Sequence, residues 1–281
     1  MTQLVAVLGI GLVQPQQPVV TADDLGLTRG DGIFDATRVV TDAAGHAVVE
    51  HLDRHLARLA RSAEVVELPA PDAAAITALV GEALAAWTTP GEAALKIVHT
   101  RGLEHGATGA TTLVTITETE PGLRRHLKVA TMSRGYASDA FADAPWLLGG
   151  AKLLSYAVHT SARREAARRG ADDALFVSSD GYALEGPTAS LLWVADGVVH
   201  TTPTGATGIL ASVTVDLLRE WAEIEGVRFE PALIRPGDLM ATQGAWLASS
   251  VRGVCPIATL DGEALPTSPE WTDRLAGAAG F

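Results

Sequence analysis

The chain has 281 residues, of which 47% are hydrophobic and 19% charged, and its formal net charge is −12. This composition is typical of folded globular proteins rather than disordered chains, and the acidic balance argues against nucleic acid and anionic membranes as partners. One cysteine, Cys255, excludes an internal disulfide and a multi-cysteine zinc site; the chain also lacks a run of ~18 apolar residues and a basic leader, so we expect a cytoplasmic enzyme or binding protein.

The first 120 residues or so mix strand and helix patterns. Periodicity predicts strands at 4–8, 32–40, 93–100 and 111–117 and helices at 51–66 and 71–87. The first helix has an apolar stripe that includes Leu56 and Leu59, beside several arginines. A polar Pro/Gly break at 117–122 is the candidate boundary, so we expect an α+β domain at 1–119 and a larger domain at 120–281.

Short strands predominate in the second half, which favours a barrel-like β domain with peripheral helices. The predicted strands are 127–132, 174–177, 182–184, 190–194 and 245–250, and the predicted helices are 155–169 and 213–226. A long irregular stretch at 133–150 separates the first strand from the first helix. Long loops are often functional, so we expect this one to border the substrate pocket.

Lys152 is the most informative single residue. It is one of three lysines among 21 basic residues, and its neighbours are small and apolar apart from Tyr156. A desolvated lysine loses its proton more easily, and the neutral amine can form a Schiff base with an aldehyde. The alternative is a lysine at a surface rim whose stem alone is buried.

A small-residue segment at 205–218 leads into the predicted helix, with Ser212 as a candidate N-cap. A helix start offers unpaired N–H groups, here those of Val213 and Thr214, which suit an anion such as phosphate. Arg58, close to the apolar side of its helix, and Ser250 at a strand end are further candidate anion ligands. The alternatives are an ordinary capped helix, a surface salt bridge and a strand-end turn, and spacing alone does not decide between them.

Together these segments resemble the class IV aminotransferase family, the fold-type IV enzymes that use pyridoxal 5′-phosphate. The resemblance runs from Thr28–Arg38 through His55–Ala63, Lys152, Gly170–Phe176, Leu184–Thr188 and Gly208–Thr214 to Ser249–Ile257. It implies an α+β fold of two domains, a small N-terminal α+β domain and a larger C-terminal barrel-like β domain with peripheral helices. It also implies a homodimer that acts on a small-molecule substrate.

The resemblance assigns roles by position. Lys152 matches the lysine that bonds to the cofactor as an imine, and Glu185 matches the carboxylate that keeps the pyridine nitrogen protonated. The residues that match contacts to the cofactor phosphate are Arg58, Val213, Thr214 and Ser250. Tyr156 matches the phenol beside the cofactor's ring oxygen, although it stands one position nearer the lysine than in the branched-chain enzymes. Ser190 and Ala211-Ser212 replace the family's usual asparagine and Pro-Gly.

Within the family, the segments look closest to aminodeoxychorismate lyase, which eliminates pyruvate from 4-amino-4-deoxychorismate to give 4-aminobenzoate for folate synthesis. Arg101 and Arg252 are candidate ligands of the substrate carboxylates, or else arginines that face solvent. The alternatives are a branched-chain or D-amino-acid aminotransferase of the same family and a degenerate homologue that binds ligand without turnover. A metal site is not expected, because His51 and His55 lack the glutamate and third ligand of a zinc motif.

Overall fold

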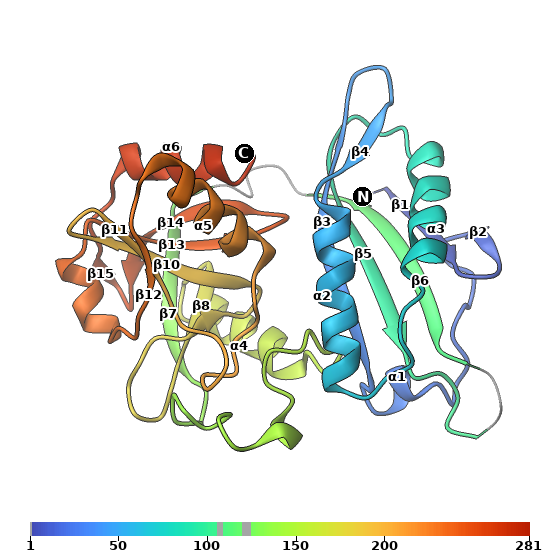
Figure 1. Ribbon diagram of the computed structural model, residues 1–281, viewed down its shortest axis with the longest axis horizontal. Coiled ribbons are helices and arrows are strands. Elements are labelled where there is room, and N and C mark those ends of the chain that lie inside the picture. The colour runs from blue at the N-terminus through green and yellow to red at the C-terminus, as the bar shows by residue number, and fades with distance from the viewer. Residues whose placement is uncertain (1, 106–108, 120–124) are drawn as a thin grey trace. The chain divides into compact units, whose positions relative to one another are not determined.

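The computed structural model describes residues 2–105, 109–119 and 125–281, which form two compact units (Figure 1). The first unit is Met1–Pro121 with Ala151–Tyr156, and the second is Gly122–Gly150 with Ala157–Phe281. The Lys152 segment therefore belongs to the first unit, although it lies far along the chain. The predicted boundary at 119/120 adjoins residues 120–124, which lie outside the described residues, so that division stays a prediction.

An antiparallel sheet with two helices on one face forms most of the first unit (Figure 1). The strand order is β2-β1-β6-β5-β3-β4. The elements are β1 (Gln3–Val7), β2 (Gly11–Val13), α1 (Leu25–Thr28), β3 (Gly32–Thr41), β4 (Ala47–Val49), α2 (Leu52–Val65), α3 (Ala73–Ala86), β5 (Gly91–Thr100) and β6 (Thr111–Glu118).

Alternation of side chains explains how this sheet packs. Leu95 and Ile97 of β5 are buried, whereas Lys96 between them is exposed, as the period-two geometry of a strand requires. Helix α2 buries Leu56, Leu59 and neighbouring residues along one stripe. Burial of such a stripe against a sheet is what stabilises a helix of this length in water.

The second unit has a nine-stranded sheet with the main order β12-β11-β10-β13-β14-β7-β8. Its elements are β7 (Leu127–Ser133), η1 (Pro145–Leu147), α4 (Ala157–Arg168), β8 (Asp173–Val177), β9 (Glu185–Gly186), β10 (Ala189–Ala195), β11 (Val198–Thr201), α5 (Val213–Glu225), β12 (Phe229–Pro231), η2 (Pro236–Ala241), β13 (Gly244–Ser249), β14 (Gly253–Leu260), β15 (Glu263–Ala264) and α6 (Pro269–Ala278). The β14–β7 and β7–β8 pairs are parallel, and the pairs of β10 with β11 and β13 are antiparallel.

Both faces of this sheet are covered, so β10 is buried at almost every position. Leu191 and Trp193 belong to one apolar cluster, while Leu192 and Val194 belong to another that includes residues of α5 and α6. The sheet also curls, because β9 pairs with β10 while the Leu184 N–H donates to the Phe176 carbonyl of β8. The barrel-like character expected from the sequence follows from this curl.

Most of the predicted elements are present, with ends shifted by no more than two residues. The predicted strand at 182–184 is reduced to an isolated antiparallel bridge between Ala183 and Val177. Tyr182 beside it bonds to Ser178 through its N–H and its carbonyl, and the next strand, β9, begins at Glu185. The predicted helix at 155–169 begins at Ala157. Its expected first residues belong instead to the extended Lys152 segment.

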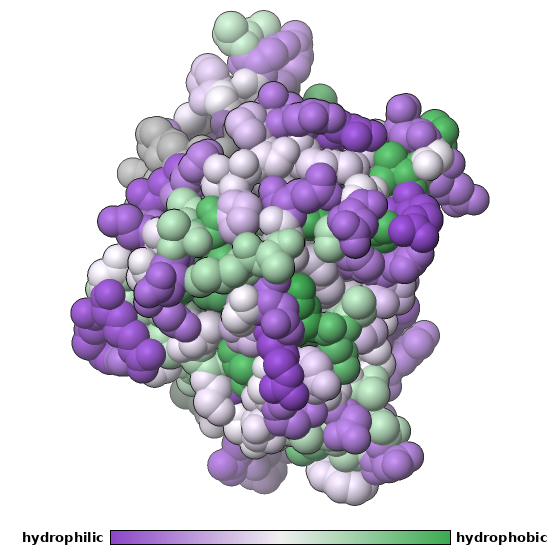
Figure 2. Space-filling model, turned by 90° about the vertical axis from the view of Figure 1, so that its left-hand side faces the viewer, coloured by the Kyte–Doolittle hydropathy of each residue, from purple (hydrophilic) through white to green (hydrophobic). Residues whose placement is uncertain are grey.

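Exposed apolar side chains are scattered over the surface. On the face shown in Figure 2, hydrophobic residues are divided by hydrophilic ones. The large hydrophobic residues that are more than half exposed are Ile10, Leu27, Val48, Trp146, Val158 and Ile224. Isolated exposure of this kind is normal and does not by itself indicate a partner. Within the described ranges, no helix has both the length and the apolarity to span a bilayer.

Candidate active site

The Lys152 segment lies alongside the first residues of β3. The Phe34 N–H donates to the Lys152 carbonyl at 2.9 Å, and the Leu154 N–H donates to the Gly32 carbonyl at 2.9 Å. This edge is available because β4 pairs with β3 only at residues 39–41. The backbone of Lys152 is therefore fixed by strand-like hydrogen bonds, which positions the side chain more firmly than a loop does.

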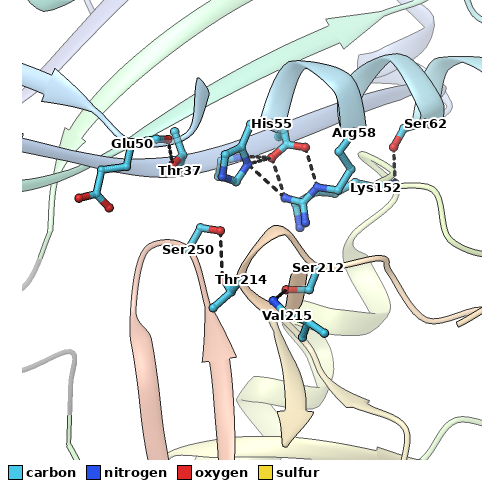
Figure 3. Close-up of polar contacts among 12 residues, drawn as sticks. Thr37, Glu50, His55, Arg58, Ser62, Lys152, Ser212, Thr214, Val215 and Ser250 are labelled. Carbon is cyan, nitrogen blue, oxygen red and sulfur yellow. Dashed lines mark hydrogen bonds and ion pairs between the residues drawn. The ribbon is translucent and has the colours of Figure 1, made fainter. Parts of the chain in front are cut away.

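The side chains around Lys152 form a small aromatic cluster. The Lys152 Nζ lies 4.7 Å from the centre of the Phe34 ring, and the Tyr156 ring packs edge-on against the same ring at 5.3 Å. The Lys152 N–H also donates to Ser62 Oγ of α2 at 3.1 Å (Figure 3). A lysine held against an aromatic face is partly shielded from water, as the amine of a Schiff-base lysine needs.

Lys96 lies beside this cluster and was missed in the sequence. Its Nζ is 4.8 Å from the centre of the Phe34 ring, and although the residue is exposed overall, partial desolvation of the amine lowers its pKa. Two of the three lysines thus share one aromatic ring. The alternation of β5 is the sequence signal, because Lys96 lies on the face opposite to Leu95 and Ile97.

Arg58 is buried and belongs to an ionic cluster with Asp35 and His55 (Figure 3). Its Nε donates to Asp35 Oδ2 at 2.9 Å and its Nη2 to Oδ1 at 2.7 Å, while His55 Nδ1 lies 2.7 Å from Oδ1. This bidentate pair fixes the plane of the guanidinium. The partner of Arg58 within the first unit is therefore a fully buried carboxylate and not a surface acid.

The charge states in this cluster follow from its contacts. Burial by itself would raise the pKa of Asp35. The hydrogen bonds from Arg58 and His55 lower this pKa by more than burial raises it, so the net pKa is well below its ordinary value. Burial lowers the pKa of His55 against the opposing influence of Asp35. At neutral pH the cluster therefore consists of a carboxylate, a neutral imidazole and a guanidinium. Asp35 and His55 were not predicted as site residues, although an acid within the largely apolar, buried strand β3 was a signal in the sequence.

The start of α5 forms a separate polar cluster in the second unit. Ser212 is the N-cap, and its Oγ accepts from the Val215 N–H at 3.3 Å. The hydroxyls of Thr214 and Ser250 lie 3.1 Å apart and hydrogen-bond to each other (Figure 3). The N–H groups of Val213 and Thr214 have no acceptor among the described residues. Two free amides and two hydroxyls at a helix N-terminus fit a phosphate group.

Glu185 lies at the start of β9, at the edge of a hollow in the second unit. The hollow is lined by Arg134, Tyr136, Phe141, Phe176, Leu184, Glu185, Thr207, Gly208 and Ile209. The Leu210 N–H approaches Glu185 Oε2 at 3.4 Å. The 133–150 stretch thus borders a hollow that contains Glu185, through Tyr136 and Phe141. A carboxylate beside apolar walls suits a cationic ring nitrogen, because an ion pair offsets the cost of burial.

Arg101 and Arg252 both have acidic partners. Arg101 donates to both oxygens of Asp31, at 2.6 and 3.2 Å, and to the carbonyls of Val66 and Glu67. Arg252 Nη1 donates to Asp173 Oδ2 at 2.7 Å. The predicted role of either guanidinium at a substrate carboxylate is untested by these contacts and stays a prediction.

Comparison with known proteins places the chain in a family. The profile of the class IV amino-transferases matches residues 32–260. The chain belongs to this family. It is 37% identical to a bifunctional aminodeoxychorismate lyase / D-amino acid transaminase of Mycobacterium tuberculosis over 95% of this chain and 94% of that protein.

Solved structures of the family agree with this membership. The fold IV-transaminase CpuTA1 of Curtobacterium pusillum superposes with a TM-score of 0.89 at 39% identity, covering 99% of this chain and 97% of that one. A pyridoxal-phosphate-bound hypothetical aminotransferase of M. tuberculosis gives a TM-score of 0.90 at 35% identity, covering 98% of each chain. The protein is therefore a pyridoxal-phosphate-dependent enzyme with the α+β, two-domain fold of fold-type IV.

Among the described residues, no three His, Cys, Asp or Glu side chains cluster as metal ligands. The His51/His55 pair was considered as a metal motif in the sequence. In the structure, His55 Nδ1 forms a hydrogen bond with Asp35.

Proposed function

We propose that this protein is an aminodeoxychorismate lyase, which eliminates pyruvate from 4-amino-4-deoxychorismate to give 4-aminobenzoate for folate synthesis. The observation that carries the proposal is the 37% identity, over nearly the full length of both chains, to an enzyme named for this activity. The geometry around Lys152 supports it, because elimination requires an amine fixed in position to remove a proton.

In this proposal the residues of the first unit hold the cofactor and move protons. Pyridoxal phosphate supplies an electron-accepting ring when it is bound. Lys152 Nζ would hold the cofactor covalently, and its amine would take the proton from the substrate carbon that bears the amino group. Tyr156 would contact the ring oxygen, and Arg58, whose plane is fixed by Asp35, would donate to the phosphate.

The residues of the second unit bind the charged ends of the same cofactor in this proposal. Glu185 accepts from the ring nitrogen and keeps its proton in place. The amides of Val213 and Thr214 and the hydroxyl of Ser250 bind the phosphate, in keeping with the free donors at the start of α5. A dianion at this position is stabilised further by the helix dipole.

A second candidate is the transamination of D-amino acids. It is favoured by the second activity in the name of the M. tuberculosis relative. A related M. tuberculosis aminotransferase, 36% identical to this chain, has been solved with α-ketoglutarate and PMP bound. The two activities require the same amine at Lys152 and differ in the fate of the substrate. A branched-chain aminotransferase is the remaining alternative, because membership of the family shows an enzyme and so argues against a binding-only homologue.

A paired assay tests the proposal. Purified holoenzyme is given 4-amino-4-deoxychorismate, with pyruvate and 4-aminobenzoate measured, and separately D-alanine with α-ketoglutarate, with D-glutamate measured. We expect product in the first assay and a slower exchange in the second. Exchange without 4-aminobenzoate would assign the enzyme as a transaminase of D-amino acids, and the absence of both products would favour the branched-chain aminotransferase.

Lys152 itself is tested by chemistry. Borohydride reduction of the holoenzyme and peptide mapping should place a pyridoxyl group on Lys152 and not on the exposed Lys128. Lys152→Ala should lower either turnover by at least about 10³-fold, whereas Lys128→Ala should leave it unchanged. A pyridoxyl group found elsewhere would refute the assignment of every role given above.

Oligomeric state and location belong to the same proposal. The cytoplasmic location is the expectation from the sequence composition, and the homodimer is what the family resemblance implies. We therefore expect twice the chain mass in sedimentation equilibrium. A monomeric holoenzyme with full turnover would contradict the dimer.

A further inference from the structure

The turn between β13 and β14 carries Ser250 and is tied to the rest of the second unit on two sides. On one side the Ser250 hydroxyl bonds to Thr214 at the start of α5, 3.1 Å away. On the other side Arg252, two residues later, reaches Asp173 at the first position of β8. The turn therefore connects the start of α5 to β8, the last strand in the sheet order.

The Asp173–Arg252 pair is buried. Asp173 is fully buried, the Arg252 side chain is 14% exposed, and Nη1 lies 2.7 Å from Oδ2. The second oxygen of Asp173 accepts from the Ala174 N–H at 2.9 Å, so β8 fixes the carboxylate. A buried acid of this kind holds its cation tightly, because removal of either partner leaves an uncompensated charge.

Asp173 dominates the placement of the guanidinium. Arg252 Nη2 is buried and has no hydrogen-bond partner among the described residues. The backbone of Arg252 is also held, since its N–H donates to Ser249 Oγ at 3.3 Å and its carbonyl accepts from Cys255 Sγ at 3.7 Å. The side chain and backbone of one residue thus fix the turn on which Ser250 lies.

We propose that Asp173 and Arg252 are positioning residues, whose ion pair holds the turn so that the Ser250 hydroxyl stays beside Thr214 and completes the phosphate-binding group at α5. The inference rests on the proposed assignment of that group to the cofactor phosphate. It gives Arg252 a role in cofactor binding and adds Asp173, which has no assigned role, to the residues on which the phosphate site depends.

The decisive test compares two ligands that differ only in the phosphate. Apo protein is titrated with pyridoxal 5′-phosphate and with pyridoxal, and dissociation constants are measured by absorbance and fluorescence. Asp173→Asn, which keeps the side-chain size but removes the charge, should weaken pyridoxal phosphate about 10-fold and pyridoxal less than twofold. Equal weakening of both ligands would overturn the inference, because it would indicate general loss of structure.

A double-mutant cycle tests whether the pair acts through Ser250. If it does, Asp173→Asn/Ser250→Ala should bind pyridoxal phosphate about as weakly as the worse single variant, roughly 10-fold below wild type. Independent action predicts a product of the two losses, roughly 100-fold, and that outcome overturns the inference. If the asparagine variant does not fold, Arg252→Lys can replace Asp173→Asn in the same cycle. Because lysine keeps the positive charge, this variant should bind pyridoxal phosphate less weakly than a variant that loses the ion pair.

Asp172→Asn is the matched control. It removes the neighbouring acid, which pairs with Arg125 instead of Arg252, and should leave both dissociation constants unchanged. A wild-type protein without preference for the phosphorylated ligand would overturn both the phosphate assignment and this inference. Coupling in the cycle without either turnover would contradict the proposed reactions alone, and the positioning role would stand.

Discussion

At the scale of single residues, Asp35 determines what Arg58 offers to a ligand. Both carboxylate oxygens bind the guanidinium, so the pair carries no net charge and Arg58 contributes oriented donors more than unbalanced positive charge. The sequence predicted an anionic partner for an arginine on the apolar side of its helix. It left open whether that partner was a ligand or a surface acid of the chain, and the structure shows a buried acid, Asp35.

His55 predicts how stability responds to pH. Its pKa is lowered in the folded protein, so the unfolded chain takes up the proton first as the pH falls through about 6.5, the ordinary value. The contribution of His55 to the free energy of unfolding is therefore fully present above pH 6.5 and is lost progressively as the pH falls below that value. Urea denaturation at pH 7.5 and 5.5 should show a larger loss for wild type than for His55→Asn, whose side chain does not titrate. An equal loss in both proteins would show that other groups cause the effect.

Arg101 connects three segments of the first unit and should contribute to stability. Arg101→Gln removes its bonds to Asp31 and to the carbonyls of Val66 and Glu67, so the free energy of unfolding should fall by about 1 kcal/mol. Chemical denaturation measures this loss. If Arg101 also binds a substrate carboxylate, KM rises as well while kcat holds; an unchanged KM would leave it a structural residue.

At the scale of elements, two helices begin with the same serine cap. Ser212 accepts from the Val215 N–H at the start of α5, and Ser268 accepts from the Trp271 N–H at the start of α6, both at 3.3 Å. They differ in what surrounds them, because the Thr214 and Ser250 hydroxyls meet at the start of α5. Capping is thus local, whereas the proposed phosphate site at α5 also uses a residue from a distant turn.

This pair of caps gives a prediction with an internal control. Ser212→Ala and Ser268→Ala should each lower the free energy of unfolding by about 1 kcal/mol, because each leaves a first-turn N–H unpaired. Of the two, only Ser212→Ala should also weaken pyridoxal phosphate binding, about 3- to 10-fold. Denaturation and apo-protein titration measure the two effects. The same loss of affinity in both variants would refute a phosphate site at α5.

At the scale of the whole molecule, binding of the cofactor to the folded state stabilises the protein by mass action. With pyridoxal phosphate at about 100 times its dissociation constant, the gain is about 2.7 kcal/mol, which for a chain of this size raises Tm by roughly 5–10 °C. Scanning calorimetry of apo and reconstituted protein measures the shift. At the same concentration of pyridoxal phosphate, Lys152→Ala should show a smaller rise in Tm than wild type, because the variant loses the covalent link. The same rise in Tm in both proteins would contradict that link.

Local signals account for what was read correctly from the sequence. The stripe of Leu56 and Leu59 predicted α2, and Ser212 was correctly read as the cap of α5, because periodicity and capping depend on near neighbours. The segment Ser268-Pro269-Glu270 carries an equally clear helix start and was overlooked at α6. The sequence therefore carried a local signal for α6 as well.

Residue types and their local order determined the family, the cofactor and Lys152 as the candidate amine, because these depend on motifs that chain neighbours complete. Tertiary structure alone decided that residues 151–156 pair with β3, that Asp35 binds Arg58 and that Asp173 binds Arg252. Each of these contacts joins residues at least 20 positions apart. No helical or strand period reaches that far, so their partners are fixed by how the sheets and helices pack.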